Sequence, residues 1–547
     1  MATFNLIREP WIGCVSVDGR PVGLAEALAS AHRMSEITDE SPLVVAALHR
    51  LLLAILHRNF GPRDTKTWGD LWKERHFPAE VLEAYWTKWE SRFDLFDDTH
   101  PFYQSATITE RDGPGTSAKL QFHLSAGNNA TLVDHTTDSL PPAIQPAEAA
   151  RALVTHQTFA LGGTVGYLES CEKDADKRGS DSPSARGAIC LLQGENLFET
   201  LMLNLAEYDP AAHPKDLPCW EHDPSQGRAE RTPDGRVDLF TWQSRRSRLF
   251  IIQASDGSTQ VDRVKLAPGF HVPLLWNAFK DESLQSFVLQ REAKPDQRPW
   301  FQYRITPEKA VWRNSSAIIH GVKGEKRQEL RPLTLNWMAQ LVWEGELPEG
   351  FQCRVEVAGF ATHQQKVRLW RREHLPVTGG LLRDPRCQES LRSSLQHADD
   401  TAYALSAATE KLAAEILSPS LEPNASNKPD PTRVKQLASS LGAEMQYWAS
   451  LSIPFHVFLE SLGLSQQLSG EDNQHSAQDT AFAGWKGSVR NAALDAFTQA
   501  SSGVTQNVRG LRAQAIAENE LRRRLAAVAR KLLGGGDALR EKQMRRS

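Results

Sequence analysis

Residues 390–417, SLRSSLQHADDTAYALSAATEKLAAEIL, have apolar side chains at helical spacing along their whole length. Three further helical stretches follow at 432–452, 481–502 and 517–534, and polar connections separate them. The connection at 419–431 contains four prolines, and proline does not continue a helix because it lacks the backbone N–H. Four consecutive helices with polar connections predict a C-terminal four-helix bundle.

The chain before this segment has a mixed pattern. RVDLFTWQSRRSRLFII at 236–252 and FQCRVEVAGF at 351–360 have the alternation or β-rich composition that predicts strands. LVVAALHRLLLAILHR at 43–58 has an apolar stripe at helical spacing, and Asp39–Pro42 supplies a cap and an early proline before it. Helices and strands are therefore both expected in the N-terminal part.

These patterns predict an α+β protein with two domains. A chain of 547 residues is too long for one ordinary core. A content of 40% hydrophobic and 24% charged residues fits a globular protein that buries substantial cores. We expect a large mixed α/β domain over residues 1–380 and the four-helix bundle over residues 381–547.

The charge is distributed unevenly. The net charge of -4 does not indicate a globally basic nucleic-acid binder. From Arg512 to the C-terminus, however, the chain has 10 Lys and Arg against 4 Asp and Glu. In the last helix, Arg523 and Arg530 fall opposite the apolar stripe, and Arg522 lies beside them. Either a solvated helix face or a face that contacts phosphates explains this pattern.

The cysteines and the N-terminus bear on the compartment. The six cysteines are scattered, without a C-x-x-C pair or a histidine at ligand spacing, which argues for reduced thiols and against a zinc site or disulfides. The N-terminus lacks the charged and then apolar layout of a signal peptide. The longest apolar run, 44–56, is interrupted by His49 and Arg50 and is expected to be too short for a bilayer. We expect a cytoplasmic protein.

Motifs of common enzyme classes do not occur in the sequence. It has no Walker A loop, no dinucleotide-binding glycine fingerprint, no H-E-x-x-H and no G-x-S-x-G. Asp94, Asp97 and Asp98 are the nearest candidate carboxylate cluster for a metal-dependent nuclease, and an ordinary loop is the simpler interpretation. We therefore expect no catalytic residue, no metal site and no cofactor.

Two loops have an unusual composition. LGGTVG at 161–166 places Gly162, Gly163 and Gly166 close together, which is typical either of a flexible turn or of close backbone approach to a partner. GFATHQQKVRLWRREH at 359–374 places uncharged polar side chains before an alternating basic run. This second stretch is either a polar turn with a solvated strand, or a probe that enters a nucleic acid while the strand holds phosphates.

Four motifs occur in an order that resembles one family. They are FNLIREPWI at 4–12, RFDLFDDTHPFYQ at 92–104, LFTWQSRRSRLF at 239–250 and G-F-x-x-x-Q-x-K-x-x-x-W-x-R from 359. In order and spacing they resemble the large subunit of the type I-E CRISPR surveillance complex Cascade, the CasA family. The helical tail fits that family's four-helix bundle.

The resemblance implies a non-catalytic subunit that binds DNA. It would recognise the protospacer-adjacent motif (PAM) in foreign duplex DNA and wedge the strands apart, so that R-loop formation with the guide RNA starts. It would also help to recruit the helicase–nuclease effector. The implied partners are double-stranded target DNA, CRISPR RNA, the backbone, small and guide-handle-binding Cascade subunits, and the effector, with no membrane.

The resemblance also assigns roles to particular residues. Gln364 matches the family's wedge, and His363 and Gln365 flank it. An uncharged amide enters a base stack without the desolvation cost of an ion and can bond to unpaired bases. The glycine loop resembles the family's minor-groove reader. The other candidate contacts are Lys366, Arg368 and Lys265 for DNA, Leu132, Val133 and Asp134 for neighbouring subunits and the guide, and Arg522, Arg523 and Arg530 for phosphates of the displaced strand or duplex.

Two alternatives stay open from the sequence. A metal-dependent nuclease subunit would need clustered carboxylates. A pure structural scaffold would never touch DNA, and changes at Gln364 or in the glycine loop would then leave target binding unaltered.

Overall fold

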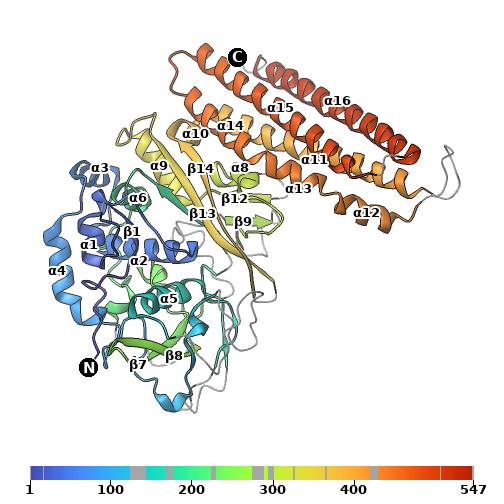
Figure 1. Ribbon diagram of the computed structural model, residues 1–547. Coiled ribbons are helices and arrows are strands. Elements are labelled where there is room, and N and C mark those ends of the chain that lie inside the picture. Colours follow the sequence, from blue (N-terminus) through green and yellow to red (C-terminus); the bar gives the residue numbers. More distant parts are fainter. Residues whose placement is uncertain are drawn as a thin grey trace. The chain divides into compact units, whose positions relative to one another are not determined.

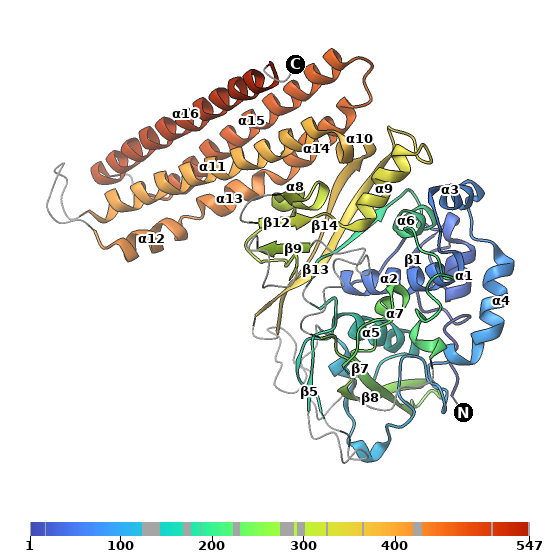
Figure 2. The ribbon, with the colours of Figure 1, turned by 180° about the vertical axis from the view of Figure 1, so that it is seen from behind.

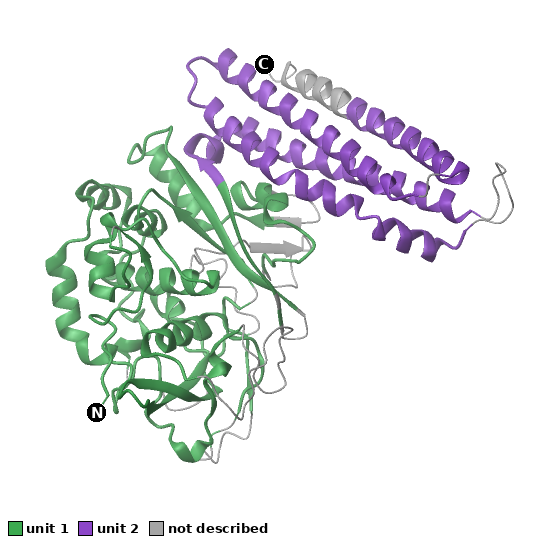
Figure 3. Cartoon of the chain, in the orientation of Figure 1, with its two compact units in different colours: residues 1–375 green, residues 376–547 purple. Residues whose placement is uncertain are grey.

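The chain forms two compact units, Met1–Leu375 (unit 1) and Pro376–Ser547 (unit 2), shown in Figure 3. The sequence pattern indicates a boundary at residue 380. The computed structural model describes residues 2–16, 18–122, 143–166, 168, 177–185, 187–222, 230–273, 289–292, 301–323, 327–363, 366–418, 429–504 and 507–544.

Helix α2, Pro42–Phe60, lies at the centre of unit 1 (Figure 1). It begins at the proline that the sequence predicts, with Ser41 as the N-cap residue, and packs against α5, α6, α7 and β13. Among the helices that the structure describes, α2 alone has the length and hydropathy of a membrane-spanning segment. The helix extends beyond the apolar run 44–56 at both ends, and 83% of its 18-residue apolar window is buried inside the unit, as in the core helix of a globular protein.

The other helices of unit 1 surround α2 or lie beside the sheets. They are α1 (Leu24–Ala29), α3 (Thr65–Glu74), α4 (Ala79–Trp89), α5 (Pro146–Phe159), α6 (Leu197–Asn204), α7 (Arg236–Phe240), α8 (Ser315–Ile319) and α9 (Leu333–Trp343).

The strands form several small sheets rather than one large one. The sheet that includes the sequence-predicted strand 351–360 has the order β14–β13–β6, and Val357 of β13 lies opposite Cys190 of β6. A second sheet pairs β7 with β8, which lie side by side near α5 (Figure 2). The strands are β1 (Cys14–Val15), β2 (Glu36–Ile37), β3 (Gly115–Thr116), β4 (Gly163–Thr164), β5 (Arg178–Gly179), β6 (Ile189–Gln193), β7 (Arg245–Gln253), β8 (Thr259–Pro268), β9 (Leu289–Glu292), β10 (Phe301–Gln302), β11 (Val322–Lys323), β12 (Arg327–Leu330), β13 (Gln352–His363) and β14 (Lys366–Thr378).

One predicted strand is partly wrong. The stretch 236–252 begins with the short helix α7, and only its second half is strand β7. The carboxylate of Asp216 accepts hydrogen bonds from the backbone N–H groups of Val237 (3.0 Å) and Asp238 (2.7 Å). These N–H groups have no partner within a helix, so a side chain some 20 residues upstream supplies the cap.

Unit 2 is the expected helical bundle, and the α+β class is confirmed. Three of the four long helical segments of this bundle are α11 (Pro385–Leu417), α15 (Glu471–Ser502) and α16 (Val508–Met544), and α11 packs against the other two. The fourth segment is interrupted and consists of α12 (Pro431–Ser440), α13 (Ala443–Ser450) and α14 (Ser452–Ser465). The short helix α10 (Gly379–Arg383) precedes the bundle.

The prediction of a single helix over 432–452 is wrong, because the structure has α12, α13 and the start of α14 in this range. Gly442 has a φ of 70°, a left-handed conformation that ends a helix and that glycine adopts without strain. Pro454 lies in the first turn of α14, where its missing N–H is tolerated. The polar stretch 465–479, SQQLSGEDNQHSAQD, lies between the helical stretches that the sequence predicts at 432–452 and 481–502. It is only partly a connection, because α15 begins at Glu471.

Candidate nucleic-acid interface

The predicted glycine loop forms one arm of a small hairpin. We call residues 161–166 and 177–181 the glycine hairpin. Its strands β4 and β5 are antiparallel, with Gly163 opposite Gly179. Gly163 is exposed, has a φ of +148° and has no atom within 4 Å of the place where a Cβ would lie. A partner can therefore approach this backbone without meeting a side chain.

The other two predicted glycines are held by neighbours. The N–H of Gly162 donates to Asp181 Oδ1 at 2.6 Å. A Cβ on Gly166, which has a φ of +153°, would lie 3.0 Å from the carbonyl oxygen of Leu266 and 3.9 Å from Lys265 Nζ. The structure thus brings together Gly166 and Lys265, which are about 100 residues apart in the sequence.

Lys265 lies on β8 and is half-buried. Its ammonium donates to the carbonyl oxygen of Asp112 and, at 3.5 Å, to that of Gly113. These two bonds orient the ammonium, because a carbonyl oxygen accepts hydrogen bonds from the lysine N–H groups. The lysine lies beside the half-buried Gly166 of a hairpin whose Gly163 is exposed, and a cation at this place suits contact with a phosphate backbone.

The predicted wedge falls in the sequence between β13 and β14. β13 ends at His363 and β14 begins at Lys366, so the candidates His363, Lys366 and Arg368 are strand residues. Gln364 and Gln365 lie outside the described residues, as do Leu132, Val133 and Asp134 of the predicted subunit-contact loop.

The base of the β13–β14 pair is held by a buried carboxylate. Glu356 is fully buried, and its Oε2 accepts hydrogen bonds from Gln193 Nε2 on β6 at 2.6 Å and from Arg372 Nε on β14 at 2.7 Å. His374 Nε2 lies 3.3 Å from the same oxygen. Arg372 also lies 3.4 Å from Glu36 Oε2. This cluster, the Glu356 clamp, ties the three strands β6, β13 and β14 together.

The predicted phosphate-binding residues of α16 are present as exposed side chains. Arg522 pairs with Glu518 at 2.7 Å, Arg523 pairs with Glu520 at 2.8 Å, and Arg530 Nε donates to the carbonyl oxygen of Ala526 at 3.3 Å. The side chains of Arg522 and Arg523 are 61% and 69% exposed. Exposed pairs within a helix are weak, so these arginines can exchange their partners for phosphates.

The candidate carboxylate cluster forms turns. Asp94 Oδ1 accepts from the backbone N–H of Phe96 at 2.8 Å, and Asp97 Oδ1 accepts from that of His100 at 2.6 Å. Asp98 Oδ1 lies 4.0 Å from Arg248 Nη2. Within the described residues, no group of three His, Cys, Asp or Glu side chains has an arrangement that could hold a metal ion.

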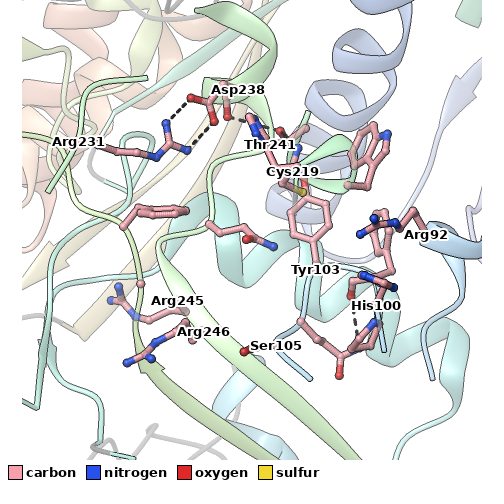
Figure 4. Close-up of a pocket in the computed structure, with 18 of the residues that line it drawn as sticks. Arg92, His100, Tyr103, Ser105, Cys219, Arg231, Asp238, Thr241, Arg245 and Arg246 are labelled. Carbon is pink, nitrogen blue, oxygen red and sulfur yellow. Dashed lines mark hydrogen bonds and ion pairs between the residues drawn. The ribbon is translucent and has the colours of Figure 1, made fainter. Parts of the chain in front are cut away.

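Unit 1 also contains a cavity of about 280 Å³. Figure 4 shows Tyr103 and Cys219 on one side of it and an Arg231–Asp238 ion pair, with N–O distances of 2.5 and 2.8 Å, on another. Burial raises the pKa of the Cys219 thiol, with Asp238 adding to the effect. The thiol is therefore protonated at neutral pH and lacks the reactivity of a thiolate.

Arg245 connects this cavity with the glycine hairpin. It lines the cavity with Arg246 (Figure 4), and its guanidinium donates to backbone oxygens of the hairpin. Sequence reasoning did not single it out, because a basic strand residue is ordinarily solvated. The available signal was its place in LFTWQSRRSRLF, where basic residues interrupt an otherwise apolar and aromatic stretch.

Comparisons with known proteins agree with these observations. The family model described as CRISPR-associated protein Cse1 matches residues 5–496. The CRISPR-associated protein CasA/Cse1 of Thermus thermophilus is 34% identical over 536 residues, which cover 95% of this chain and 97% of that protein.

Solved structures share the fold. The structure of Thermus thermophilus CasA (Cse1) superposes with a TM-score of 0.74 at 29% identity, covering 96% of this chain and 100% of that one. A chain of a CRISPR RNA-guided surveillance complex superposes with a TM-score of 0.67 at 18% identity, covering 95% of this chain and 100% of that one. At this lower identity the likeness is one of fold.

Proposed function

Because the chain belongs to the CRISPR-associated Cse1 (CasA) family, we propose that it is the DNA-recognition subunit of a type I-E CRISPR surveillance complex. It reads the PAM of foreign duplex DNA through the glycine hairpin and Lys265. It then inserts Gln364 between the strands to start R-loop formation with the guide RNA. It acts in the cytoplasm without a catalytic centre of its own, bound to the other Cascade subunits and CRISPR RNA, and α16 helps to recruit the helicase–nuclease.

One observation carries this proposal: the glycine hairpin has an exposed backbone at Gly163 and lies beside Lys265 at Gly166. Minor-groove edges differ little between base pairs, so a reader of that groove needs close backbone approach more than long side chains. A nearby cation adds affinity for phosphates without specifying sequence. In RNA-guided recognition, protein reads only the short adjacent motif while base pairing reads the rest.

Replacing Gly163 by valine is expected to reduce PAM discrimination. The new side chain would project into the space where the groove edge approaches. The ratio of affinities for a PAM-bearing and a scrambled duplex should fall roughly tenfold, about the worth of one base-edge hydrogen bond. Filter binding or interferometry of the assembled complex on the two duplexes measures this ratio.

Gly257→Val is a matched control. Gly257 is a turn glycine of the β7–β8 sheet with a φ of +82° and open space at its Cβ position, so the backbone strain is comparable. It should lower stability slightly and leave discrimination unchanged. Equal losses of discrimination in both variants would show that the Gly163 effect is general strain.

Gln364→Ala is expected to slow R-loop formation while leaving duplex capture nearly unchanged. Unstacking a base step costs a few kcal/mol, and the amide offsets this cost only once the strands separate. A target with the first base pairs already opened should restore the rate. Gln352→Ala, which removes an exposed glutamine at the other end of β13, is the matched control. The wedge role is wrong if the opened target shows the same defect as intact duplex.

A further inference from the structure

Arg245 holds both arms of the glycine hairpin from inside unit 1. Its side chain is buried, with the residue only 2% exposed. Nη2 donates to the carbonyl oxygen of Leu161 at 2.7 Å, and Nη1 donates to that of Ser180 at 2.8 Å. Leu161 precedes β4 and Ser180 follows β5, so one guanidinium bonds to the backbone of both arms of the hairpin.

The arginine is itself fixed by helix α5. The side-chain amide of Gln157 donates to the carbonyl oxygen of Arg245 at 2.8 Å and accepts from its N–H at 3.0 Å. The hydroxyl of Ser244 donates to the carbonyl oxygen of Gln157 at 3.1 Å. Gln157 is 1% exposed, and buried amide bonds of this kind are costly to leave unmade. The support of the hairpin therefore extends back to a core helix.

The absence of a side chain at Gly179 leaves room for the guanidinium of Arg245. A Cβ at Gly179 would lie 2.7 Å from Arg245 Cζ and 2.8 Å from its Nη1, and 2.7 Å from Val165 Cγ2. Real Cβ atoms do not approach other heavy atoms so closely. The space that a side chain would fill on β5 is thus occupied by the guanidinium, which is evidence for this arrangement independent of the hydrogen bonds.

The charge of Arg245 is retained in this setting. Burial lowers its pKa to about 10, and Asp181 opposes the shift. The guanidinium is therefore protonated at neutral pH, and its hydrogen bonds to the hairpin are charge-assisted. Asp181 also accepts a hydrogen bond from the N–H of Gly162. Asp181 and Arg245 therefore both bind the backbone at residues 161–162.

We propose that Arg245 is a positioning residue that fixes the backbone of the glycine hairpin, and that PAM discrimination depends on this fixation although Arg245 need not touch DNA. The inference rests on the proposed function for the part that concerns DNA. The anchoring of the hairpin stands on the contacts alone, so the two parts can be tested separately.

Arg245→Lys tests the proposal while retaining the charge. Lysine has one donor atom on a flexible stem, so it cannot span Leu161 and Ser180 as the planar guanidinium does. Hydrogen exchange of the Gly162 and Val165 amides, which bond to Asp181 and to the Lys177 carbonyl, should become at least about tenfold faster. The affinity ratio of PAM-bearing to scrambled duplex should fall roughly tenfold, and affinity for the scrambled duplex should be unchanged.

Arg236→Lys is the matched control for lost stability. Arg236 is another buried arginine of unit 1, and its guanidinium donates to the carbonyl oxygens of Ala206 and Glu207. This variant should lose stability without affecting the hairpin amides or discrimination. Gly179→Ala, which displaces the guanidinium without removing it, should reproduce the Arg245→Lys phenotype, and its effect should be smaller in an Arg245→Ala background.

The outcomes separate the two parts. Faster hairpin exchange with lost discrimination in Arg245→Lys and Gly179→Ala, but not in Arg236→Lys, supports the proposal. Unchanged hairpin exchange in Arg245→Lys overturns it, whatever happens to DNA binding. Faster exchange with intact discrimination leaves the anchoring in place and overturns the reading role of the hairpin.

Discussion

Replacing Glu356 by alanine is expected to destabilise unit 1 by about 3 kcal/mol. Removing one partner of a buried ion pair costs about 3–5 kcal/mol, because the remaining groups stay buried without their acceptor. The lower end applies here, since Arg372 is 30% exposed and can turn towards water. Gln193 is buried and has no such escape. Urea unfolding, followed by hydrogen exchange of peptides from β6 and β13, measures the change.

The expected loss is specific to the Glu356 clamp. Burial raises the pKa of Glu356, but the hydrogen bonds from His374 and Arg372 together lower it by more than burial raises it. The carboxylate is therefore ionised at neutral pH. Glu356→Gln keeps the shape without the charge and should cost less than alanine. Glu26→Ala removes an exposed pair with Arg20 and should cost about 1 kcal/mol or less. A similarly small cost for Glu356→Ala would mean that the clamp does not stabilise the strands.

Unit 1 is expected to lose about 4 kcal/mol of stability for each pH unit below pH 6. Burial lowers the pKa values of His57, His156 and His320, with nearby Arg236, Arg245 and Arg331 adding to the effect respectively. The values for His156 and His320 fall from 6.5 to about 3.

The stability falls as the pH falls because these three histidines stay neutral in the folded state. The unfolded chain binds protons at these histidines below about pH 6.5, whereas the folded chain does not until the pH reaches the lowered pKa. The stabilisation is therefore complete above pH 6.5, and for His156 and His320 it is lost as the pH falls towards 3. Each histidine contributes roughly 1.4 kcal/mol per pH unit in that window, and three together approach a large share of a typical domain stability.

Urea titrations between pH 7.5 and 5 measure this slope. His156→Gln should reduce it by about one proton, or roughly 1.4 kcal/mol per pH unit, and His76→Gln, at an exposed position, should not change it. Stability that is flat between pH 7 and 5 would mean that these histidines are charged or solvated in the folded protein.

Local signals in the sequence predict much of this fold. Asp39 and Glu40 before α2 and Pro42 at its first position mark its start, and the spacing of apolar residues predicts α11, α15 and α16. The sequence also contains the signal for the interruption between α12 and α13, because glycine, here Gly442, often ends a helix. These features depend on residues that are neighbours in the sequence.

Features that depend on distant residues were not predictable. α7 is capped by Asp216, β6 pairs with β13 more than 150 residues later, and the buried Arg245 has its partners on another hairpin. For the site, the family resemblance indicated the glycines and Lys265, but only the structure places Gly166 beside Lys265. Charge patterning alone would have placed Arg245 in solvent.

The central position of α2 has a consequence for the protein's synthesis. α2 packs against β13, which leaves the ribosome about 300 residues later, or roughly 15–60 s at ordinary translation rates. During that interval a 19-residue helix with the hydropathy of a membrane span lacks part of its native cover. Nascent chains of this protein are therefore expected to require a ribosome-associated chaperone, which keeps α2 from aggregating or from being engaged by the membrane-insertion machinery.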